Sequence, residues 1–594
     1  MRSRIIMSML TGAIVLASTV LGGGTARADV SSPLTSSSSS LSSSSPASAP
    51  APGAAPGPVP ARGSAPASTS DAVPAEFGTD WHDPLTAAPP VTRPHARSCQ
   101  VTLAEAQFRD FTPYRGSYAP PKGCGERWSK VVLRLDGKIK GRQFDRLGYL
   151  HVGGVEIFRT STPEPSPAGI EWSVEKDVTR YTDTFRSARD VEMLIGNVVD
   201  DTYTGVIDVK VTLTFYEGKP APPTTATAPA TATSTVPDRI LTLDDGPGGT
   251  TLTTPRNSER VVAEVYATGS GGGCEEYWYL TVPATAPYSC RADGGPYREV
   301  QVTVDGQLAG IAAPFPTVWT GGWSNPFLWY VVPGPRAFDI KPIEYDLTPF
   351  AGILNDGRPH QVEVSVVGVS EGQSGWSTPV NVLVWQDAGK SVVGGGLLTH
   401  TAGELTDSTH YTPGTEHRVD TEGGHRLAVA GYLDTSHGRV RTTVTRDLAN
   451  TSAHRWTDGE TVDGLAASWT DDESVTVDGH GPARTTRTHR TYTMDGTTTL
   501  GADDRLHTVL TLGDRADSVT TRNGRRTSWS RLDDTYTGDA TFTVNVPRDQ
   551  RHAVGTTSER YRLYGSDGCY DRRLTTAQGV LTSAGFGDSG SGCR

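Results

Sequence analysis

The chain has 594 residues, of which 36% are hydrophobic, and a formal net charge of −12. This length is enough for three or four domains that each bury a core of their own. The negative balance excludes nucleic acid and anionic membranes as partners, because those partners need clustered positive charge. Gly, Pro, Thr and Ser are abundant, which is typical of a turn-rich β protein and not of a helical bundle.

The first residues have the pattern of a secretory signal peptide. Arg2 and Arg4 precede an apolar run over residues 5–21, and Ala26-Arg27-Ala28 fits a small-x-small cleavage site. A membrane anchor is the alternative, but serines and threonines interrupt the run, and it is short for a bilayer of about 30 Å. We predict a signal peptide over residues 1–28 and a secreted mature protein without a membrane segment.

Two segments have too few apolar side chains to form a core. Residues 29–76 are mostly Ser, Ala, Pro and Gly, and residues 218–237 are mostly Pro, Thr and Ala. Such compositions do not bury enough surface to offset the loss of backbone entropy. We predict a disordered segment over the first range and an extended linker over the second.

The linker divides two regions that are rich in strand patterns. In residues 77–217 and 238–390, β-branched and aromatic residues alternate partially with polar ones, which predicts sandwich or barrel strands. Asp305-Gly306 lies between apolar runs and predicts a hairpin turn. The predicted strands are 128–139, 149–159, 191–199 and 206–218 in the first region, and 258–269, 277–282, 298–310, 360–369 and 380–387 in the second.

Residues 391–594 form a third region that is rich in Thr, Arg, Asp and Gly. Segments such as 439–450, 508–515, 518–529 and 541–547 read as amphipathic strands with polar outward faces. This alternation suits an antiparallel sheet with one face in water.

The six cysteines fall as three local pairs: Cys99 with Cys124, Cys274 with Cys290, and Cys569 with Cys593. In an oxidising compartment this spacing favours disulfides, although the sequence leaves the connectivity open. A metal site is disfavoured, because there is no CxxC pair and no histidine at ligand spacing from a cysteine.

Three long stretches resemble one family of enzymes. They are FDRLGYLHVGGVEIFRTSTPEP (144–165), the pair 297–329 and 338–364, and GYLDTSHGRVRTTVTRDL (431–448). They are similar to the peptide-N-glycosidase A family, the glycoamidases that release N-linked glycans from asparagine. The resemblance implies an N-glycopeptide or N-glycoprotein substrate and no metal or organic cofactor.

A more distant resemblance concerns the chemistry. Phe144-Asp145-Arg146 and Gly273-Cys274-Glu275-Glu276-Tyr277 are similar to two acidic motifs of the flavobacterial peptide-N-glycosidase F enzymes, one in each of two adjacent jelly rolls. The resemblance implies two adjacent jelly-roll-like sandwich domains. Together with the strand patterns of residues 391–594, it predicts an all-β chain with a β-rich C-terminal domain. It selects Asp145 and Glu276 as catalytic acids, with Arg146 and the ambiguous neighbour Glu275 at the substrate.

The sequence departs from that group at the third acid. The comparable strand reads LIGNVVDD (194–201), which puts Asn197 at that position. An asparagine side chain can hydrogen-bond to substrate but cannot titrate. Asp200 or Asp201 is a weaker candidate for the missing acid, and an arginine near the second-domain site has no clear counterpart in residues 324–329.

Hydrolysis of a glycosylated asparagine suits a pair of acids. One carboxyl group orients or deprotonates water and the other protonates the leaving nitrogen, which works best when their pKa values differ. We expect Asp145 to have the primary role at the scissile amide and Glu276 to position water or substrate, and the sequence leaves open which of them transfers the proton. The alternatives are structural: Asp145 as a strand-entry residue paired with Arg146, and Glu276 as a solvated neighbour of a disulfide. Without the resemblance these alternatives would be favoured for both residues.

Three tryptophans lie in the Gly/Pro-rich stretch 318–334: Trp319, Trp323 and Trp329. Aromatic faces can stack on sugar rings, so these residues are candidates for substrate binding. Packing in the core is an equally good explanation for each of them.

The sequence therefore predicts a secreted glycoamidase that releases the intact N-glycan and converts the linked asparagine to aspartate. Two rivals have a physical basis. A glycoside hydrolase would also use paired carboxylates, and a non-catalytic extracellular protein could bind glycans through the same aromatic residues.

Overall fold

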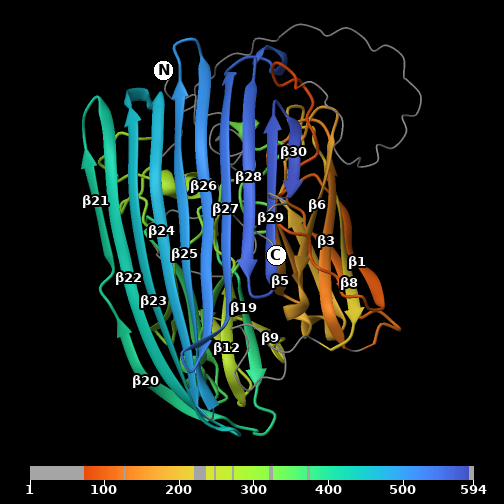
Figure 1. The fold of residues 1–594 in the computed structure, drawn as a ribbon, viewed down its shortest axis with the longest axis vertical. Helices are drawn as coiled ribbons and strands as arrows, with labels where there is room; N and C mark the ends of the chain where they lie inside the picture. Colours follow the sequence, from red (N-terminus) through yellow and green to blue (C-terminus); the bar gives the residue numbers. More distant parts are fainter. Residues whose placement is uncertain are drawn as a thin grey trace, which may run out of the picture.

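The computed structural model describes residues 73–125, 127–219, 236–246, 249–270, 273–319, 325–370, 375–479 and 481–586. Nearly all of its regular structure is antiparallel β-sheet, which confirms the predicted all-β class. Figure 1 shows one long, curved sheet beside two smaller sets of sheets. The predicted signal peptide, nearly all of the segment 29–76 and most of the linker lie outside the described residues. Within the described residues, no helix has the length and apolar character needed to cross a membrane.

The first region is a sandwich of two four-stranded sheets. Alternate side chains of the strands, such as Leu133 and Leu135, are buried between the sheets. Every residue of the edge strand β5 is buried, because the second region covers this strand from outside. One sheet has the order β1 (Ser98–Phe108), β8 (Ile207–Glu217), β3 (Trp128–Ile139) and β6 (Ile170–Asp177), and the other β2 (Tyr114–Tyr118), β7 (Arg189–Ile195), β4 (Leu147–Val152) and β5 (Val155–Ser161).

The predicted strand 149–159 is wrong as a single strand and is instead the hairpin of β4 and β5. Gly153 and Gly154 form its turn with φ angles of 57° and 82°, a backbone region that glycine occupies without steric cost. The pairing runs from Val152 opposite Val155 to Leu147 opposite Ser161. The residues before β4 and after β5 therefore lie side by side.

The second region contains a five-stranded and a four-stranded sheet. The predicted Asp305-Gly306 turn is confirmed: it joins β14 to β15 with φ angles of 48° and 75°. The five-stranded order is β10 (Asp244–Gly246), β11 (Gly249–Leu252), β17 (His360–Val367), β14 (Glu299–Val304) and β15 (Gln307–Ala312); the four-stranded order is β16 (Ile343–Asp346), β12 (Ser258–Val265), β19 (Val380–Gln386) and β9 (Arg239–Thr242). Two short strands, β13 (Thr268–Gly269) and β18 (Trp376–Ser377), pair beside them.

The predicted strand 277–282 is wrong. Residues Gly273–Leu280 form a kinked 3₁₀ segment, η3, in which Glu275 and Trp278 are buried three positions apart. The aromatic composition that suggested a strand reflects burial, and burial governs β-propensity more than the backbone does.

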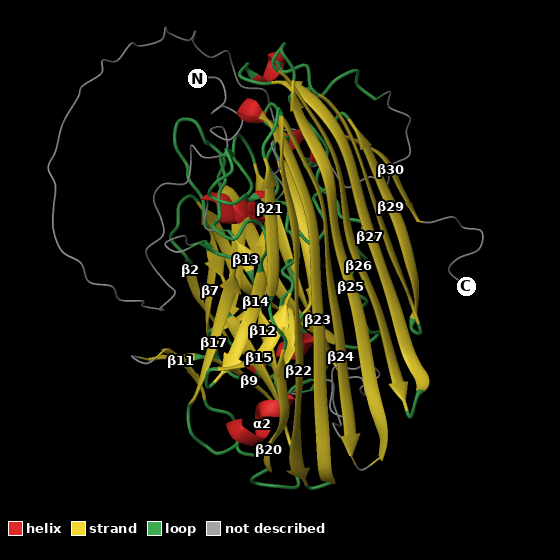
Figure 2. Ribbon diagram, turned by 90° about the vertical axis from the view of Figure 1, so that its left-hand side faces the viewer, coloured by secondary structure: helices red, strands yellow, loops and turns green. Residues whose placement is uncertain are grey.

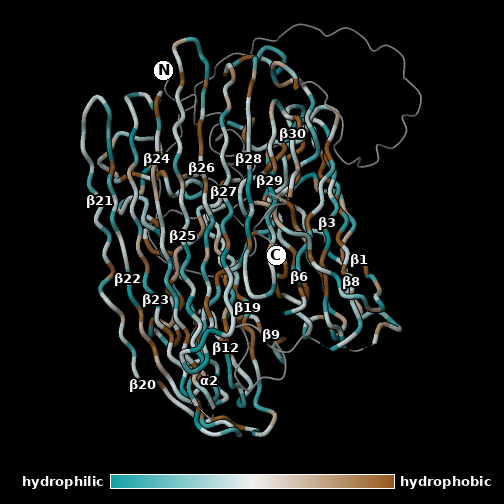
Figure 3. Tube along the Cα trace, in the orientation of Figure 1, coloured by the Kyte–Doolittle hydropathy of each residue, from teal (hydrophilic) through white to brown (hydrophobic). Residues whose placement is uncertain are grey.

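The third region is an eleven-stranded antiparallel sheet with strands of up to 20 residues. Buried and exposed residues alternate along it, and Figure 3 shows the matching alternation of hydropathy. The predicted sheet with one wetted face is thus confirmed. Its strands are β20 (Gly394–Ala402), β21 (Thr406–Thr412), β22 (Glu416–Thr435), β23 (Gly438–Thr457), β24 (Val462–Gly479), β25 (Gly481–Leu500), β26 (Arg505–Arg522), β27 (Arg525–Thr543), β28 (Val554–Gly565), β29 (Gly568–Ala577) and β30 (Val580–Phe586).

The buried face of this sheet packs on the other two regions (Figure 2). Trp329 stacks on Tyr536 with ring centroids 4.9 Å apart, and the Asn325 amide donates to the Ala540 carbonyl at 2.8 Å. Arg336 forms two hydrogen bonds of 2.6 and 2.7 Å to Asp514. One hydrophobic core runs through all three regions, so the predicted domain boundaries stay predictions.

Arg336→Met should destabilise the protein strongly, because Asp514 is only 3% exposed and would keep a buried charge without its partner. Losing one partner of a buried pair costs about 3–5 kcal/mol. The measurement is the midpoint and free energy of unfolding in guanidinium chloride. Arg531→Met is the matched control, since Arg531 pairs with Asp517 on the outer face, where both are largely exposed, and should change stability by about 0.5 kcal/mol or less. Equal effects of the two variants would contradict the prediction.

Candidate active site

Asp145 lies in the loop between β3 and β4, next to the open end of the β4–β5 hairpin. Beyond the last strand pair, the Arg146 amide donates to the Thr162 hydroxyl and the Thr162 amide donates to the Arg146 carbonyl, both at 2.9 Å. These bonds continue the hairpin register by one residue. They place Asp145 beside the segment that carries Glu164.

Glu276 lies on η3 of the second region, which the Cys274–Cys290 disulfide ties to the following loop with Cα atoms 5.2 Å apart. Its neighbour Glu275 is buried and accepts hydrogen bonds of 2.9 and 2.6 Å from Arg298 and one of 2.6 Å from the Trp376 indole. The adjacent Glu276 is half-buried. Its carboxyl group lies in the electrostatic field of Asp145 and Arg146.

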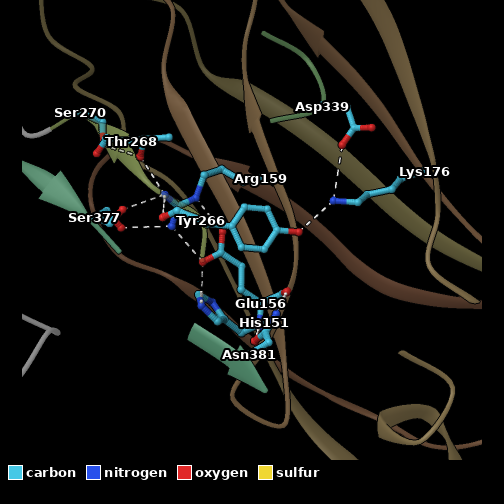
Figure 4. A network of polar contacts seen from close by, with 10 residues as sticks. All are labelled: His151, Glu156, Arg159, Lys176, Tyr266, Thr268, Ser270, Asp339, Ser377 and Asn381. Carbon is cyan, nitrogen blue, oxygen red and sulfur yellow. Dashed lines mark hydrogen bonds and ion pairs between the residues drawn. The ribbon is translucent and has the colours of Figure 1, made fainter. Parts of the chain in front are cut away.

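A buried polar network joins the two regions that carry these acids (Figure 4). Arg159 on β5 forms two hydrogen bonds of 2.7 and 2.9 Å to Glu156 and also donates to the Thr268 hydroxyl at 2.7 Å. The Asn381 side-chain amide donates to the Glu156 backbone carbonyl at 2.7 Å, and its oxygen accepts from the Glu156 backbone N–H at 3.1 Å. The network therefore fixes the first sandwich against the second.

The same contacts extend toward Glu276. Thr268 precedes Gly269, which pairs with Trp376. A Cβ atom on Gly269 would lie 2.1 Å from the Glu275 carbonyl oxygen, so only glycine fits here. The position of η3 thus depends on the strand that Arg159 holds.

The two glutamates have strongly raised pKa values. Burial, and then the negative charge of Asp145, raises the pKa of Glu276 to about 8, against Arg146 and a hydrogen bond from Tyr277. Burial and Asp145 also raise the pKa of Glu164 to about 8, against Arg548, Arg551 and Arg146. Three carboxyl groups therefore share one site in which both glutamates are protonated at neutral pH.

Arg146 lies within the field of all three acids. Burial lowers the pKa of its guanidinium, while Asp145, Glu164 and Glu276 oppose that shift. One guanidinium nitrogen, Nη2, donates to Gln143 at 2.5 Å. Its Nε is buried and has no hydrogen-bond partner among the described residues, so a donor is left for a group that enters the site.

Glu164 is the acid that the sequence analysis missed. It is 6% exposed, and the Tyr330 hydroxyl hydrogen-bonds to it. Tyr330 stacks on Trp81 at 4.0 Å, and Arg548 of the third region lies over Trp81 at 5.0 Å. The signal was present in the sequence: reading 149–159 as a hairpin places Glu164 next to Asp145.

Other predicted site residues have structural contacts. The Asn197 amide donates to the Phe108 and Gly205 carbonyls at 2.9 and 3.1 Å, and its oxygen accepts from the Val198 amide at 2.9 Å. Asp200 caps a turn through the amides of Thr202 and Tyr203 at 2.7 Å. Both side chains thus stabilise loops, and Glu164 becomes the candidate for the third acid.

Two of the three candidate tryptophans are also buried. Trp319 is 4% and Trp329 1% exposed, so core packing accounts for them, and Trp323 lies outside the described residues.

The disulfide Cys99–Cys124 is present with Cα atoms 6.0 Å apart, and the predicted Cys569–Cys593 pair lies outside because Cys593 is not described. Where the chain is described, no group of three or more His, Cys, Asp or Glu side chains is placed to hold a metal ion.

Comparisons with known proteins agree with the resemblance seen in the sequence. Residues 88–401 match the family described as peptide N-acetyl-β-D-glucosaminyl asparaginase amidase A. The peptide-N4-(N-acetyl-β-glucosaminyl)asparagine amidase A of Prunus dulcis is 30% identical over 387 residues, which cover 60% of this chain and 67% of that protein.

Two solved structures are similar at low identity. PNGase F, a glycosylasparaginase from Flavobacterium meningosepticum, is 11% identical, with 49% of this chain and 96% of that chain covered and a TM-score of 0.31. PNGF-II is 13% identical, with 49% and 66% covered and a TM-score of 0.34. The family match spans more than half of the chain, and the chain therefore belongs to the peptide N-acetyl-β-D-glucosaminyl asparaginase amidase A family.

Proposed function

We propose that this protein is a secreted glycoamidase that hydrolyses the β-aspartylglucosylamine bond of N-glycopeptides or N-glycoproteins. The observation that carries the proposal is the charge state of the acid cluster in a member of this family: Asp145 is the negative charge that helps to keep Glu276 and Glu164 protonated. An ionised acid beside a neutral one is what amide hydrolysis by general base and general acid needs. The two disulfides support an oxidising compartment and hence secretion.

The reaction uses these groups in sequence. Asp145 accepts a proton from water as the water oxygen bonds to the carboxamide carbon of the linked asparagine. The Arg146 guanidinium, with its unpartnered Nε, stabilises the negative charge that develops on the amide oxygen. Glu276 donates its proton to the nitrogen as the carbon–nitrogen bond breaks. The products are an aspartate on the peptide and an intact glycan with a 1-amino group, and Asp145 returns its proton to Glu276 through solvent.

Asp145→Asn and Glu276→Gln should each lower kcat/KM for glycan release from an N-glycopeptide by about 10²–10⁴-fold, which is the usual contribution of a general acid or base. Mass spectrometry of the peptide identifies the reaction, because amide hydrolysis raises the peptide mass by about 1 Da, whereas a glycosidase leaves a sugar or an unchanged asparagine. Asp136→Asn and Glu105→Gln are the controls, since both carboxylates lie on the surface. Undiminished release by the first two variants would sink the assignment.

The pH profile should report the protonated acid. Since the pKa of Glu276 is about 8, kcat/KM should fall as pH rises above that value and the proton donor is lost. Tyr277→Phe removes a hydrogen bond that favours the charged form, so it should move this limb to higher pH. Tyr149→Phe removes a hydroxyl that does not act on Glu276 and should leave the limb in place; a limb that stays in place in Tyr277→Phe as well would exclude Glu276 as the acid.

Stability should also depend on the buried acid. The pKa of Glu164 in the folded protein, about 8, lies above its ordinary value of 4.5. The stabilising contribution of the protonated form is complete below 4.5 and is lost as pH rises through 8. Melting temperatures at pH 5 and pH 9 should therefore differ less in Glu164→Gln than in the wild type. Glu105→Gln, which is exposed, should retain the wild-type difference; a retained difference in Glu164→Gln would contradict the buried, protonated state.

A further inference from the structure

Three arginines from two distant parts of the sequence gather beside the acid cluster. Arg142 precedes Asp145 by three residues in the β3–β4 loop. Arg548 and Arg551 lie between β27 and β28 of the third region, in and just after the 3₁₀ turn η7 (Arg548–Gln550). Burial, Arg548 and Arg142 all lower the pKa of Arg551, and Glu164 is one of the groups that oppose the shift. Arg551 therefore lies in the field of both Arg548 and Arg142, and Arg548 and Arg551 both act on Glu164.

Aromatic rings support each guanidinium. Arg142 lies over Tyr203 at 5.5 Å, Arg548 over Trp81 at 5.0 Å, and Arg551 over Phe542 at 5.6 Å. Such cation–π contacts fix the flat guanidinium while they leave its edge free to donate hydrogen bonds. The three side chains are thus held in place before any ligand arrives.

The charges of these arginines are not balanced by close carboxylates. Within the described parts of the chain, none of the three forms an ion pair, with a nitrogen within 4.0 Å of a carboxylate oxygen. Glu164, which lies in the field of Arg548 and Arg551, is protonated below a pH of about 8. Asp200 offsets part of the charge of Arg142, and its carboxylate also accepts hydrogen bonds from the Thr202 and Tyr203 amides. A positive cluster remains beside a site that holds one ionised acid.

We infer that Arg142, Arg548 and Arg551 form a subsite for a carboxylate group of the substrate, next to the amide that is cleaved. This inference rests on the proposed function. Arginine binds carboxylates through paired, charge-assisted hydrogen bonds, and the gathering of like charges is relieved when an anion enters. Glycopeptides carry carboxylates on the peptide, close to the linked asparagine, or on acidic sugars, and both are the same chemistry for these guanidiniums.

The subsite gives the third region a part in substrate selection. The family match ends at residue 401, so Arg548 and Arg551 lie beyond the matched segment. The strand before their loop packs on the second region, where Phe542 lies 5.2 Å from Phe327. Within the loop, the Thr543 amide donates to the Arg551 carbonyl at 2.7 Å.

The test compares kcat/KM for synthetic glycopeptides that carry one neutral glycan. One peptide has aspartate next to the linked asparagine and a free C-terminal carboxylate, and its partner has asparagine and a C-terminal amide. A third substrate joins the neutral peptide to a sialylated glycan. We expect a preference of about tenfold or more for a carboxylate-bearing substrate, weakened by salt. The first and third substrates show whether the peptide or the sugar supplies the group.

The variants test the arginines themselves. Arg548→Gln and Arg551→Gln should each bring the ratio of rates for acidic and neutral substrates toward one. The ratio is the readout because any effect on Glu164 acts on both substrates alike. Arg531→Gln, on the outer face of the same sheet, should keep the wild-type ratio. A variant that fails to fold is replaced by Arg548→Lys or Arg551→Lys, which keeps the charge, loses the paired geometry and should lower the ratio less.

The outcomes separate this inference from the proposed function. Equal rates for all three substrates, or an unchanged ratio in both arginine variants, would overturn the subsite and leave the glycoamidase assignment in place. Absence of glycan release from every substrate would overturn the proposed function, and the subsite with it.

Discussion

The buried ion pair of Glu156 and Arg159 is the constraint on which the candidate site depends. Both residues are about 1% exposed and lie on β5, so each charge is tolerable only while the other remains bonded to it. On one side, β5 is part of the hairpin whose open end carries Asp145 and Glu164. On the other, Arg159 holds Thr268 at 2.7 Å, and the next residue, Gly269, abuts the backbone of Glu275. One buried contact thus sets the acids of two regions relative to each other.

Desolvation then determines the chemistry. An exposed glutamate would be ionised at neutral pH, and three ionised carboxylates in one site would repel each other. Burial raises the pKa of Glu164 and Glu276 to about 8, whereas the guanidiniums of Arg146, Arg548 and Arg551 oppose a larger shift for Glu164. The result is a proton donor close to neutral pH beside an acceptor. The same burial leaves the arginines with more positive charge than the site balances, which is why an anionic group of the substrate fits there.

The sequence predicted what local patterns control. Alternation along residues 439–450 and 508–515 indicated a sheet with one wetted face, and Asp305-Gly306 indicated a hairpin, and both are present. Errors arose where burial comes from other regions. The aromatic run 277–282 looked like a strand, although Trp278 is buried by Trp469 of the third region, 5.4 Å away. Asn197 was placed at a third-acid position by alignment alone, while Glu164 is set beside Asp145 by strand register that a single-strand reading of 149–159 had hidden.

The third region illustrates how packing can carry functional residues that pattern analysis leaves without a role. Its long strands bury one face on the sandwiches, so packing at this interface helps to position the loops that leave the sheet beside it. The interface includes the Trp329–Tyr536 stack and the contact of Phe327 with Phe542, which lies one residue before the end of β27. A loop that leaves the sheet one residue after such an anchor has little freedom. Arg548 and Arg551 lie beyond the family match of residues 88–401, and the packing of the third region on Phe327 and Trp329 brings them into the field of Glu164.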